Sequence, residues 1–389
     1  MALHRREFIK NAAMGTLCLG TSLPSLAAPL FSYRGLKDLS ALGAPDALGL
    51  RLPTGFKGRL LAQGGQGVQT VSGAVTPYVW HVAADGGACY DLADGGWIYT
   101  SNSEIALGGG GAGALRFDAL GRVVDAYSIL KGTSMNCAGG KTPWQTWLSC
   151  EETSQGQVYE CDIFGTTAAV VRRGLGTFKH EAVAIDTQRM QAYLTEDEKD
   201  GGFYRYTPSS VVDGRMNLDE GLLEIAIVDT AGGVTWAKLE DPNPGIFSTP
   251  TRKQIAGRQI FNGGEGIWYH EGTVHFSTKG DNRVWSYDTI TQMLTVIYDQ
   301  QTSSNPMLSG VDNIVVSNDG HILVAEDGGD MQIVVLGPYG DIYPLLQVTG
   351  QDGSEITGPA ISPNSGHLYF SSQRGKILGL TYGIEGPFA

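Results

Sequence analysis

The chain has 389 residues, of which 42% are hydrophobic and 17% are charged, and 55 residues are glycine. This composition provides enough apolar side chains for a large core, but so many glycines are unfavourable in helices and typical of turns. The formal net charge of −13 excludes attraction to nucleic acid or to an anionic membrane surface. The sequence therefore predicts a soluble, mostly β protein that would need bound cations to attract an anionic substrate.

The first 28 residues have the layout of a cleaved export signal. A basic start is followed by an apolar run and then by small residues at the cleavage position. Residues 5–10, RREFIK, resemble the twin-arginine motif, which directs folded cargo to the twin-arginine export machinery. The apolar run is too short to remain as a membrane anchor. We therefore expect residues 29–389 to form the mature protein, periplasmic or secreted and monomeric, with a net charge of about −15.

One pattern occurs six times: an apolar strand that ends in a small residue, a polar cluster, a glycine-containing turn and a second strand. The intervals between the small residues are 49, 46, 82, 48 and 46, and all but the long one match a four-stranded propeller blade. The sequence therefore predicts an all-β, six-bladed β-propeller as one domain, with an insertion at about 207–261 between repeats three and four. A β-sandwich, the alternative fold, would not need one signature six times. The small residues are Thr100, Ser149, Thr195, Ser277, Ala325 and Ser371.

Polar side chains flank these small residues at two places. In a blade the innermost strand turns back into an antiparallel second strand, so the start of the first and the end of the second lie on one face. Residues about 12 to 14 positions before each small residue should therefore meet those just after it, around one channel mouth. The preceding group is Asn136, Cys137, His180, Glu181, Glu265, Asp312, Asn313, Gly358 and Pro359, and the following group is Asn102, Glu104, Glu151, Glu152, Glu196, Asp197, Lys279, Asp281, Glu326, Asp327, Gln373 and Arg374.

So many carboxylates at one mouth predict bound cations. Without cations the carboxylates would repel one another and be driven towards protonation. Glu181 and Glu265 begin apolar strands, where an unpaired carboxylate is costly and metal ligation would offset the cost. The recurrence of acidic pairs at one blade position also favours a metal site over ordinary turn chemistry. The recurring pairs are Glu151–Glu152, Glu196–Asp197 and Glu326–Asp327.

Four cysteines remain after the export signal, an even number that is compatible with disulfides in an oxidising compartment. Cys150 and Cys161 flank one predicted hairpin and are the candidate pair. Cys137 differs, because it lies where the other repeats place carboxylates. A thiolate there would favour a transition metal, whereas the surrounding carboxylates would bind a hard ion such as calcium.

The run GGGGAG at residues 108–113 differs from a phosphate-binding loop. No strand-to-helix context surrounds it, and nucleotide-binding glycine motifs require that context. We therefore predict a flexible loop at these residues.

Nine segments spread along the mature chain resemble a known family, the PhoX-type alkaline phosphatases with their smaller relatives. The segment from Asn136 to Glu152 is long and specific, whereas the shorter acidic segments are individually weak. The resemblance implies a six-bladed propeller that holds two ferric ions (Fe3+) and calcium ions (Ca2+), with a cysteine thiolate among the iron ligands. It also implies hydrolysis of phosphate monoesters. The resembling segments cover most of the mature chain and read SNSE, NCAGGKTPWQTWLSCEE, HEAVAID, YLTEDE, GEGIWY, TKGDNRVWSYD, VDNIVVSNDG, AEDGG and GPAISPN.

The resemblance also assigns residues to the metal centre. It implies that Cys137 is the iron-bridging cysteine and that Asn136 is its neighbour. The other matching positions are acidic. They are Glu104, Glu181 and Glu265 as iron or calcium ligands, and Glu151, Glu152, Glu326 and Asp327 as acids near the metals.

One position departs from the family pattern. The family has a phosphate-contacting arginine two residues before the position of Glu265, whereas this chain has Gly263. Lys279 and Arg374 are the candidate replacements for that cation. We therefore predict a metal-dependent phosphatase acting on a small phosphate ester, in which Lys279 or Arg374 holds the phosphoryl oxygens.

Two other interpretations remain beside the phosphatase. One is a calcium-dependent, lactonase-type hydrolase, a chemistry that six-bladed propellers also support, but Cys137 would then have little purpose. The other is a noncatalytic binding propeller stabilised by calcium, which is consistent with the glycine at position 263.

Overall fold

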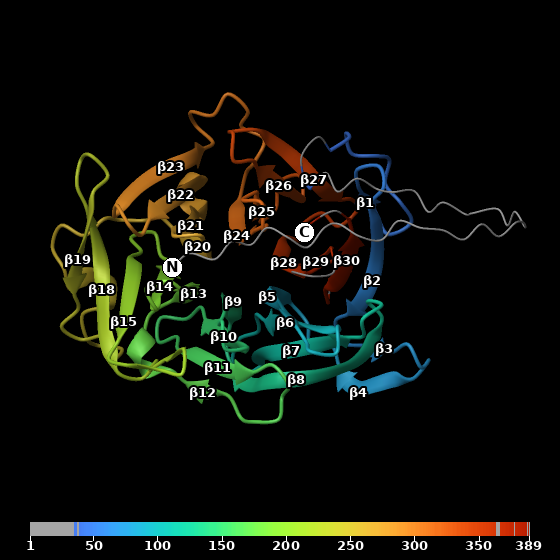
Figure 1. Ribbon diagram of the computed structural model, residues 1–389, viewed down its shortest axis with the longest axis horizontal. Coiled ribbons are helices and arrows are strands. Elements are labelled where there is room, and N and C mark those ends of the chain that lie inside the picture. The colour runs from blue at the N-terminus through green and yellow to red at the C-terminus, as the bar shows by residue number, and fades with distance from the viewer. Residues whose placement is uncertain (1–34, 37–38, 363–365, 377, 387, 389) are drawn as a thin grey trace, which may run out of the picture. The chain divides into compact units, whose positions relative to one another are not determined.

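The computed structural model describes residues 35–36, 39–362, 366–376, 378–386 and 388, and the predicted export signal lies outside them. In the described chain, six sheets of four or five strands follow one another around a central axis (Figure 1). The innermost strands contact each other in chain order and the last contacts the first, which closes a ring. This arrangement confirms the predicted six-bladed β-propeller. No helix in the described part of the chain is long and apolar enough to cross a membrane.

Blades one to three are antiparallel sheets that start with their innermost strands. Blade one consists of β5 (Ala84–Asp91), β6 (Trp97–Ser103), β7 (Gly110–Phe117) and β8 (Val123–Thr133). Blade two consists of β9 (Asn136–Lys141), β10 (Thr146–Glu151), β11 (Val158–Asp162) and β12 (Val170–Val171). Blade three has five strands, β13 (His180–Asp186), β14 (Gln191–Glu196), β15 (Phe203–Pro208), β18 (Gly221–Val228) and β19 (Val234–Lys238).

Blade four consists of β20 (Gly264–His270), β21 (Thr273–Thr278), β22 (Arg283–Asp288) and β23 (Met293–Asp299).

Blades five and six are completed by strands from the beginning of the described chain. Blade five consists of β24 (Val311–Val316), β25 (Ile322–Glu326), β26 (Gln332–Leu336), β27 (Ile342–Val348) and β1 (Leu50–Arg51). Blade six consists of β28 (Ile356–Ser362), β29 (His367–Ser372), β30 (Leu380–Glu385) and β2 (Lys57–Gln63). Because β2 pairs with β30, hydrogen bonds between distant parts of the sequence fasten the ring.

The segment predicted as an insertion, at about 207–261, is partly blade. Within it, β18 pairs with β15 and β19 pairs with β18, so both strands complete blade three. The rest of the segment is a small hairpin and a long connection to β20. The elements outside the blades are the hairpins β3 (Gly67–Gln69) with β4 (Val75–Val79) and β16 (Val211–Val212) with β17 (Arg215–Met216), and the 3-10 helices η1 (Arg173–Leu175), η2 (Thr251–Lys253) and η3 (Lys279–Asp281).

The glycine run at 108–113 is not a loop throughout, because β7 begins at Gly110. A Cβ atom on Gly111 would lie 2.4 Å from the Leu130 carbonyl oxygen, and one on Gly113 would lie 2.6 Å from the Tyr78 hydroxyl. The glycines therefore allow neighbouring backbone and side chains to approach β7 closely. The predicted flexible loop is wrong for residues 110–113, which lie in this strand.

The cysteines of the described chain are free, and the candidate disulfide between Cys150 and Cys161 does not form. Cys161 lies opposite Trp147 on the neighbouring strand, three residues before Cys150. Successive side chains point to opposite faces of a strand, so the two thiols lie on opposite faces of blade two. They are buried in different apolar clusters, Cys161 with Trp147 and Cys150 with Leu148.

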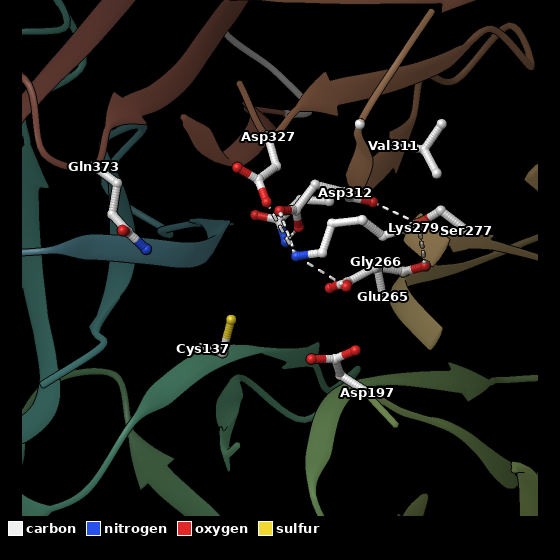
Figure 2. A network of polar contacts seen from close by, with 12 residues as sticks. Cys137, Asp197, Glu265, Gly266, Ser277, Lys279, Val311, Asp312, Asp327 and Gln373 are labelled. Atoms are coloured by element: carbon white, nitrogen blue, oxygen red, sulfur yellow. Dashed lines mark hydrogen bonds and ion pairs between the residues drawn. The ribbon is translucent and has the colours of Figure 1, made fainter. Parts of the chain in front are cut away.

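Three of the six recurring small residues join neighbouring blades. Thr195 on β14 donates a hydrogen bond of 2.5 Å to the Glu265 carbonyl oxygen of blade four. Ser277 on β21 donates a bond of the same length to the Asp312 carbonyl oxygen of blade five (Figure 2). Both hydroxyls are buried, and a buried hydroxyl needs such a partner. In blades two to four the recurring hydroxyl therefore bonds to a neighbouring blade, whereas that of Thr100 bonds within blade one.

A β-bulge interrupts the start of the innermost strands. In β20 the pairing with β21 shifts between Gly264 and Ile267, and β5, β13 and β24 shift at the corresponding place. A Cβ atom on Gly266 would lie 2.5 Å from the backbone nitrogen of Ile314 in the next blade. The inner strands therefore approach too closely for a larger residue there, and the bulge re-aims the residue before it, Glu265, at the channel mouth.

Candidate metal centre

Two positions in every blade lie at one mouth of the channel. One is the second residue of the innermost strand, and the other is the first residue after the second strand. The latter is fixed by its backbone N–H, which donates to the carbonyl of the residue before the innermost strand at 2.7 to 3.2 Å in all six blades. The second residues are Asp85, Cys137, Glu181, Glu265, Asp312 and Thr357, and the following residues are Glu104, Glu152, Asp197, Lys279, Asp327 and Gln373.

Three clusters at this mouth could each hold a metal ion, because their ligand atoms lie within 4.8 Å of one another. Successive clusters share one carboxylate, so they form a continuous row across blades two to six. Figure 2 shows Cys137, Glu265 and Asp327 around one space, although they come from different blades. The first cluster is Cys137, Glu152 and Glu181, the second is Glu181, Glu265 and Asp312, and the third is Asp312, Asp327 and Glu355.

Glu181 belongs to two of these clusters and is fully buried. Neither of its carboxylate oxygens has a hydrogen-bond partner in the described chain. Burial raises the pKa of Glu181 well above its ordinary value, and the carboxylates of Glu265 and Glu152 raise it further. A buried carboxylate without a partner is costly. Its position therefore fits a ligand shared between two bound cations.

Cys137 adds a sulfur donor to the first cluster. Its Sγ atom lies 3.5 Å from Oδ2 of Asp85. Burial raises the pKa of the thiol well above its ordinary value, and the carboxylates of Asp85 and Glu181 act in the same direction. A bound metal ion would reverse this effect and hold the group as a thiolate. The sulfur donor suits a transition metal, whereas the oxygen donors of the other clusters suit a hard cation.

The two predicted phosphate-binding cations both lie at the mouth, in different surroundings. The ammonium of Lys279 lies 3.0 Å from Oε1 of Glu265 and 3.2 Å from Oδ2 of Asp327. The guanidinium of Arg374 lies 3.0 Å from Oε2 of Glu104, and its side chain is 49% exposed. Lys279 is thus enclosed by carboxylates of the row, and Arg374 stands at its edge.

A family model for the alkaline phosphatase PhoX matches residues 59–169 and 156–292. Together these matches span more than half of the chain. The chain belongs to the PhoX alkaline phosphatase family. No curated protein sequence matches the chain.

Solved structures agree with this membership at the level of the fold. PhoX from Pseudomonas fluorescens, in complex with vanadate, a transition state analogue, has a TM-score of 0.70 at 16% identity, over 90% of this chain and 98% of that chain. A Bacteroides thetaiotaomicron protein of unknown function has a TM-score of 0.54 at 11% identity, over 86% and 79%. A gluconolactonase from Xanthomonas campestris, with a TM-score of 0.47 at 11% identity over 90% and 99%, is too distant to support an argument.

Gly263, which stands where the PhoX family pattern has an arginine, is the residue before an innermost strand. Its φ of +70° suits glycine, and a Cβ atom there would lie 3.2 Å from Oδ1 of Asp197. In blade three the corresponding residue is Lys179, whose ammonium lies 2.7 Å from Oδ2 of Asp197 and 2.9 Å from Oε1 of Glu152. A cation therefore approaches the same carboxylate from the neighbouring blade. The sequence reasoning did not single out Lys179.

The sequence reasoning also missed two acids of this PhoX-family site, Asp85 and Glu355. Asp85 lies 15 residues before Thr100, outside the spacing that was searched. Counting the second residue of each inner strand would have found it. Its carboxylate accepts a hydrogen bond of 2.6 Å from the amide of Gln373, which also donates to Glu104 at 2.8 Å. Glu355 precedes its inner strand, at the position that Lys179 occupies in blade three.

Two of the predicted metal-site acids face away from the row. Glu151 accepts hydrogen bonds from the backbone N–H groups of Ser134 and Gln157, at 2.9 and 3.3 Å. Glu326 accepts the equivalent pair from two backbone N–H groups at 2.9 and 3.0 Å. These two carboxylates therefore stabilise backbone segments within their own blades.

Asn136 also points into its blade, although it lies beside Cys137. Its amide nitrogen donates to Ser149 at 2.9 Å, and its amide oxygen accepts from Thr133 at 2.5 Å. Glu104 lies next to the row, bound to Gln373 and Arg374. The predicted metal residues that the structure brings into the row are Cys137, Glu152, Glu181, Glu265 and Asp327.

Proposed function

We propose that this member of the PhoX family is a metal-dependent phosphatase that hydrolyses phosphate monoesters at the row of clusters. The observation that carries the proposal is the carboxylate of Glu181, which is fully buried, has no protein partner among the described residues and belongs to two clusters. Such a group must either be protonated or have a cation beside it, and its place in two clusters supports the cation. Family membership supports the class of reaction.

The donor atoms support two kinds of metal. The first cluster, Cys137 with Glu152 and Glu181, would hold ferric iron, because a thiolate and carboxylates suit a transition metal. The third cluster offers oxygen donors alone, from Asp312 and its neighbours, and would hold calcium. When bound, these ions polarise the phosphoryl group and activate its attacking nucleophile.

Arg374 is the chain's own candidate for binding the phosphoryl oxygens. A guanidinium has five N–H donors in a planar fork, and one nitrogen is used on Glu104. The fork matches two oxygens of a phosphate. The backbone N–H of Arg374 donates to Ser354 at 3.0 Å, which fixes the base of the side chain. Lys279 suits this role less well, because its ammonium is already shared among buried carboxylates.

Hydrolysis of p-nitrophenyl phosphate at alkaline pH, by protein exported through its native route, tests the proposal. We expect iron and calcium in the isolated protein, and we expect Arg374→Ala to lower kcat/KM about tenfold or more, chiefly through KM. Arg116→Ala, which removes an exposed ion pair to Asp94, is the matched control. Metal-loaded protein that binds but does not turn over phosphate esters would favour the noncatalytic propeller, and turnover of lactones alone would favour the lactonase.

A further inference from the structure

Lys279 is the one cation at a position that other blades fill with an acid or an amide. It is the first residue after β21, equivalent to Glu104, Glu152, Asp197, Asp327 and Gln373 in the other blades. Its backbone is fixed at this place, because its N–H donates to the Gly263 carbonyl at 2.8 Å. The next N–H, of Gly280, donates to the Asn262 carbonyl at 3.0 Å. These backbone hydrogen bonds of blade four therefore place the side chain of Lys279 at the row.

The ammonium of Lys279 contacts three carboxylates from three elements. It lies 3.0 Å from Glu265 on β20, 3.2 Å from Asp327 after β25 and 3.9 Å from Asp312 on β24. Figure 2 shows the side chain extending into the space between these acids. Glu265 and Asp312 are nearly fully buried. One ammonium therefore spans the second cluster and the third cluster at once.

These surroundings favour a charged Lys279 strongly. Lysine is protonated at neutral pH, and the carboxylates of Glu265, Asp327 and Asp312 lie 3.0, 3.2 and 3.9 Å from the ammonium and stabilise its charge. A lysine ammonium is a compact point charge with three donors, so it can stand among carboxylate oxygens much as a metal ion does. A second cation bound in the same space would be repelled by it.

The charges of the two clusters are consistent with this role. The second and third clusters together contain five carboxylates, and Lys279 adds one positive charge among them, which leaves four negative charges. Two divalent cations would balance those four charges. With a neutral residue at position 279, five carboxylates would remain, and a further cation would be needed.

We propose that Lys279 is a built-in cation that takes the place of a metal ion between the second and third clusters. The chain therefore loads fewer metal ions than its acidic side chains could hold. This inference rests on the proposed function, because it presumes that the row binds metal. It goes beyond that function by assigning one part of the row to a side chain.

Calcium binding to Lys279→Met tests the inference without an activity assay. Methionine is unbranched, one atom shorter than lysine, and removes the charge. We expect about one additional calcium ion per chain by equilibrium dialysis, or binding about tenfold tighter by calorimetry, than in the wild type. Lys253→Met is the control, because Lys253 pairs with Asp200, which belongs to none of the three clusters. We expect its calcium stoichiometry to equal that of the wild type.

Thermal unfolding gives a second readout. In a chelator, Lys279→Met should unfold at a lower temperature than the wild type, and calcium should raise its midpoint more than that of the wild type. If Lys279→Met and Lys279→Gln both fail to fold in a chelator but fold with calcium, the inference is supported, because an added cation then replaces the lysine. Failure of both to fold even with calcium would overturn it.

The remaining outcomes separate this inference from the proposed function. If the wild type binds calcium and Lys279→Met binds it with the same stoichiometry and affinity, the inference is wrong while the proposed function stands. Weaker binding by Lys279→Met would also contradict it, since the lysine would then position metal ligands. If neither protein binds calcium or iron, the proposed function fails, and this inference fails with it.

Discussion

At the scale of single residues, two adjacent acids have separate roles. Glu151 binds backbone N–H groups of its own blade, whereas Glu152 belongs to the first cluster. We expect Glu151→Gln to lower the free energy of unfolding by about 1–3 kcal/mol, because its amide NH2 would face a backbone N–H. We expect Glu152→Gln to change that free energy by less than about 1 kcal/mol, since it loses one ion pair to Lys179.

For metal affinity we expect the opposite order, with the larger loss in Glu152→Gln. Glu152→Gln removes a ligand, so its metal affinity should fall about tenfold or more, whereas Glu151→Gln should bind metal like the wild type. Chemical denaturation in a chelator and calorimetric titration with calcium measure the two effects. Equal losses of metal affinity in both variants would contradict the separation of roles.

Cys137 carries a spectroscopic prediction. A thiolate bound to ferric iron gives a visible charge-transfer band, so we expect Cys137→Ala to lose the band together with most of the phosphatase activity. Cys89→Ala is the control, because Cys89 is a buried thiol of an apolar cluster in blade one. Absorption spectra of the iron-loaded proteins measure the difference. An unchanged band in Cys137→Ala would exclude the thiol as a ligand.

The sequence predicted which residue types form the site better than it predicted which side chains face the channel. The recurrence of acidic pairs identified Glu152 and Asp327 together with Glu151 and Glu326. Side chains alternate along a strand, so just one member of each pair can face the channel, and the end of the strand decides which. That end was not visible in the sequence. Asp85 was missed because it lies 15 positions before Thr100, whereas the corresponding residues of the other blades lie 12 to 14 positions before their small residues.

At the scale of elements, β2 joins an early part of the described chain to blade six by pairing with β30. Ala62 on this strand is buried in an apolar cluster with Trp80 and Tyr369, whereas Leu60 on the same strand is 41% exposed. We expect Ala62→Asp to lower the free energy of unfolding by about 3 kcal/mol or more, because it buries an unpaired charge. Leu60→Asp should change it by less than about 0.5 kcal/mol.

Denaturant unfolding and limited proteolysis of these two variants test the role of the strand. Ala62→Asp should also be cleaved faster near β2, because the strand would separate from β30 more often. Similar, small effects in both variants would mean that the strand contributes little to the closed ring.

The blades could be predicted from the sequence, and their closure could not. Each repeat carries a small residue at one position, and at three of the six positions its hydroxyl bonds to a neighbouring blade, as Thr195 does with Glu265. β1 and β2 have no such signature, since they pair as outer strands with partners about 300 residues away in sequence. The outer strands β18 and β19 of blade three were assigned to an insertion because they too lack the signature, although they pair with neighbours in the sequence.

At the scale of the whole molecule, the ring gathers carboxylates whose pKa values are raised by folding. Burial raises the pKa of Glu152 and of Asp312 to about 7, and it raises that of Glu355 to about 9. A carboxyl group with a raised pKa binds its proton more tightly in the folded state. Its contribution to stability is therefore complete below its unfolded pKa and is lost as the pH rises through its folded pKa.

Protein in a chelator should consequently become less stable between about pH 5 and about pH 9. Calcium should reverse this trend, because it binds the ionised carboxylates and competes with protons for them. A single site stabilises the folded state by about 2.7 kcal/mol when calcium exceeds its Kd a hundredfold, and several sites add to this value. Thermal unfolding across this pH range, with chelator and with calcium, measures both trends. If the two series run parallel, cations do not bind among these carboxylates. Protonation alone would then relieve the repulsion between the acids at the channel mouth.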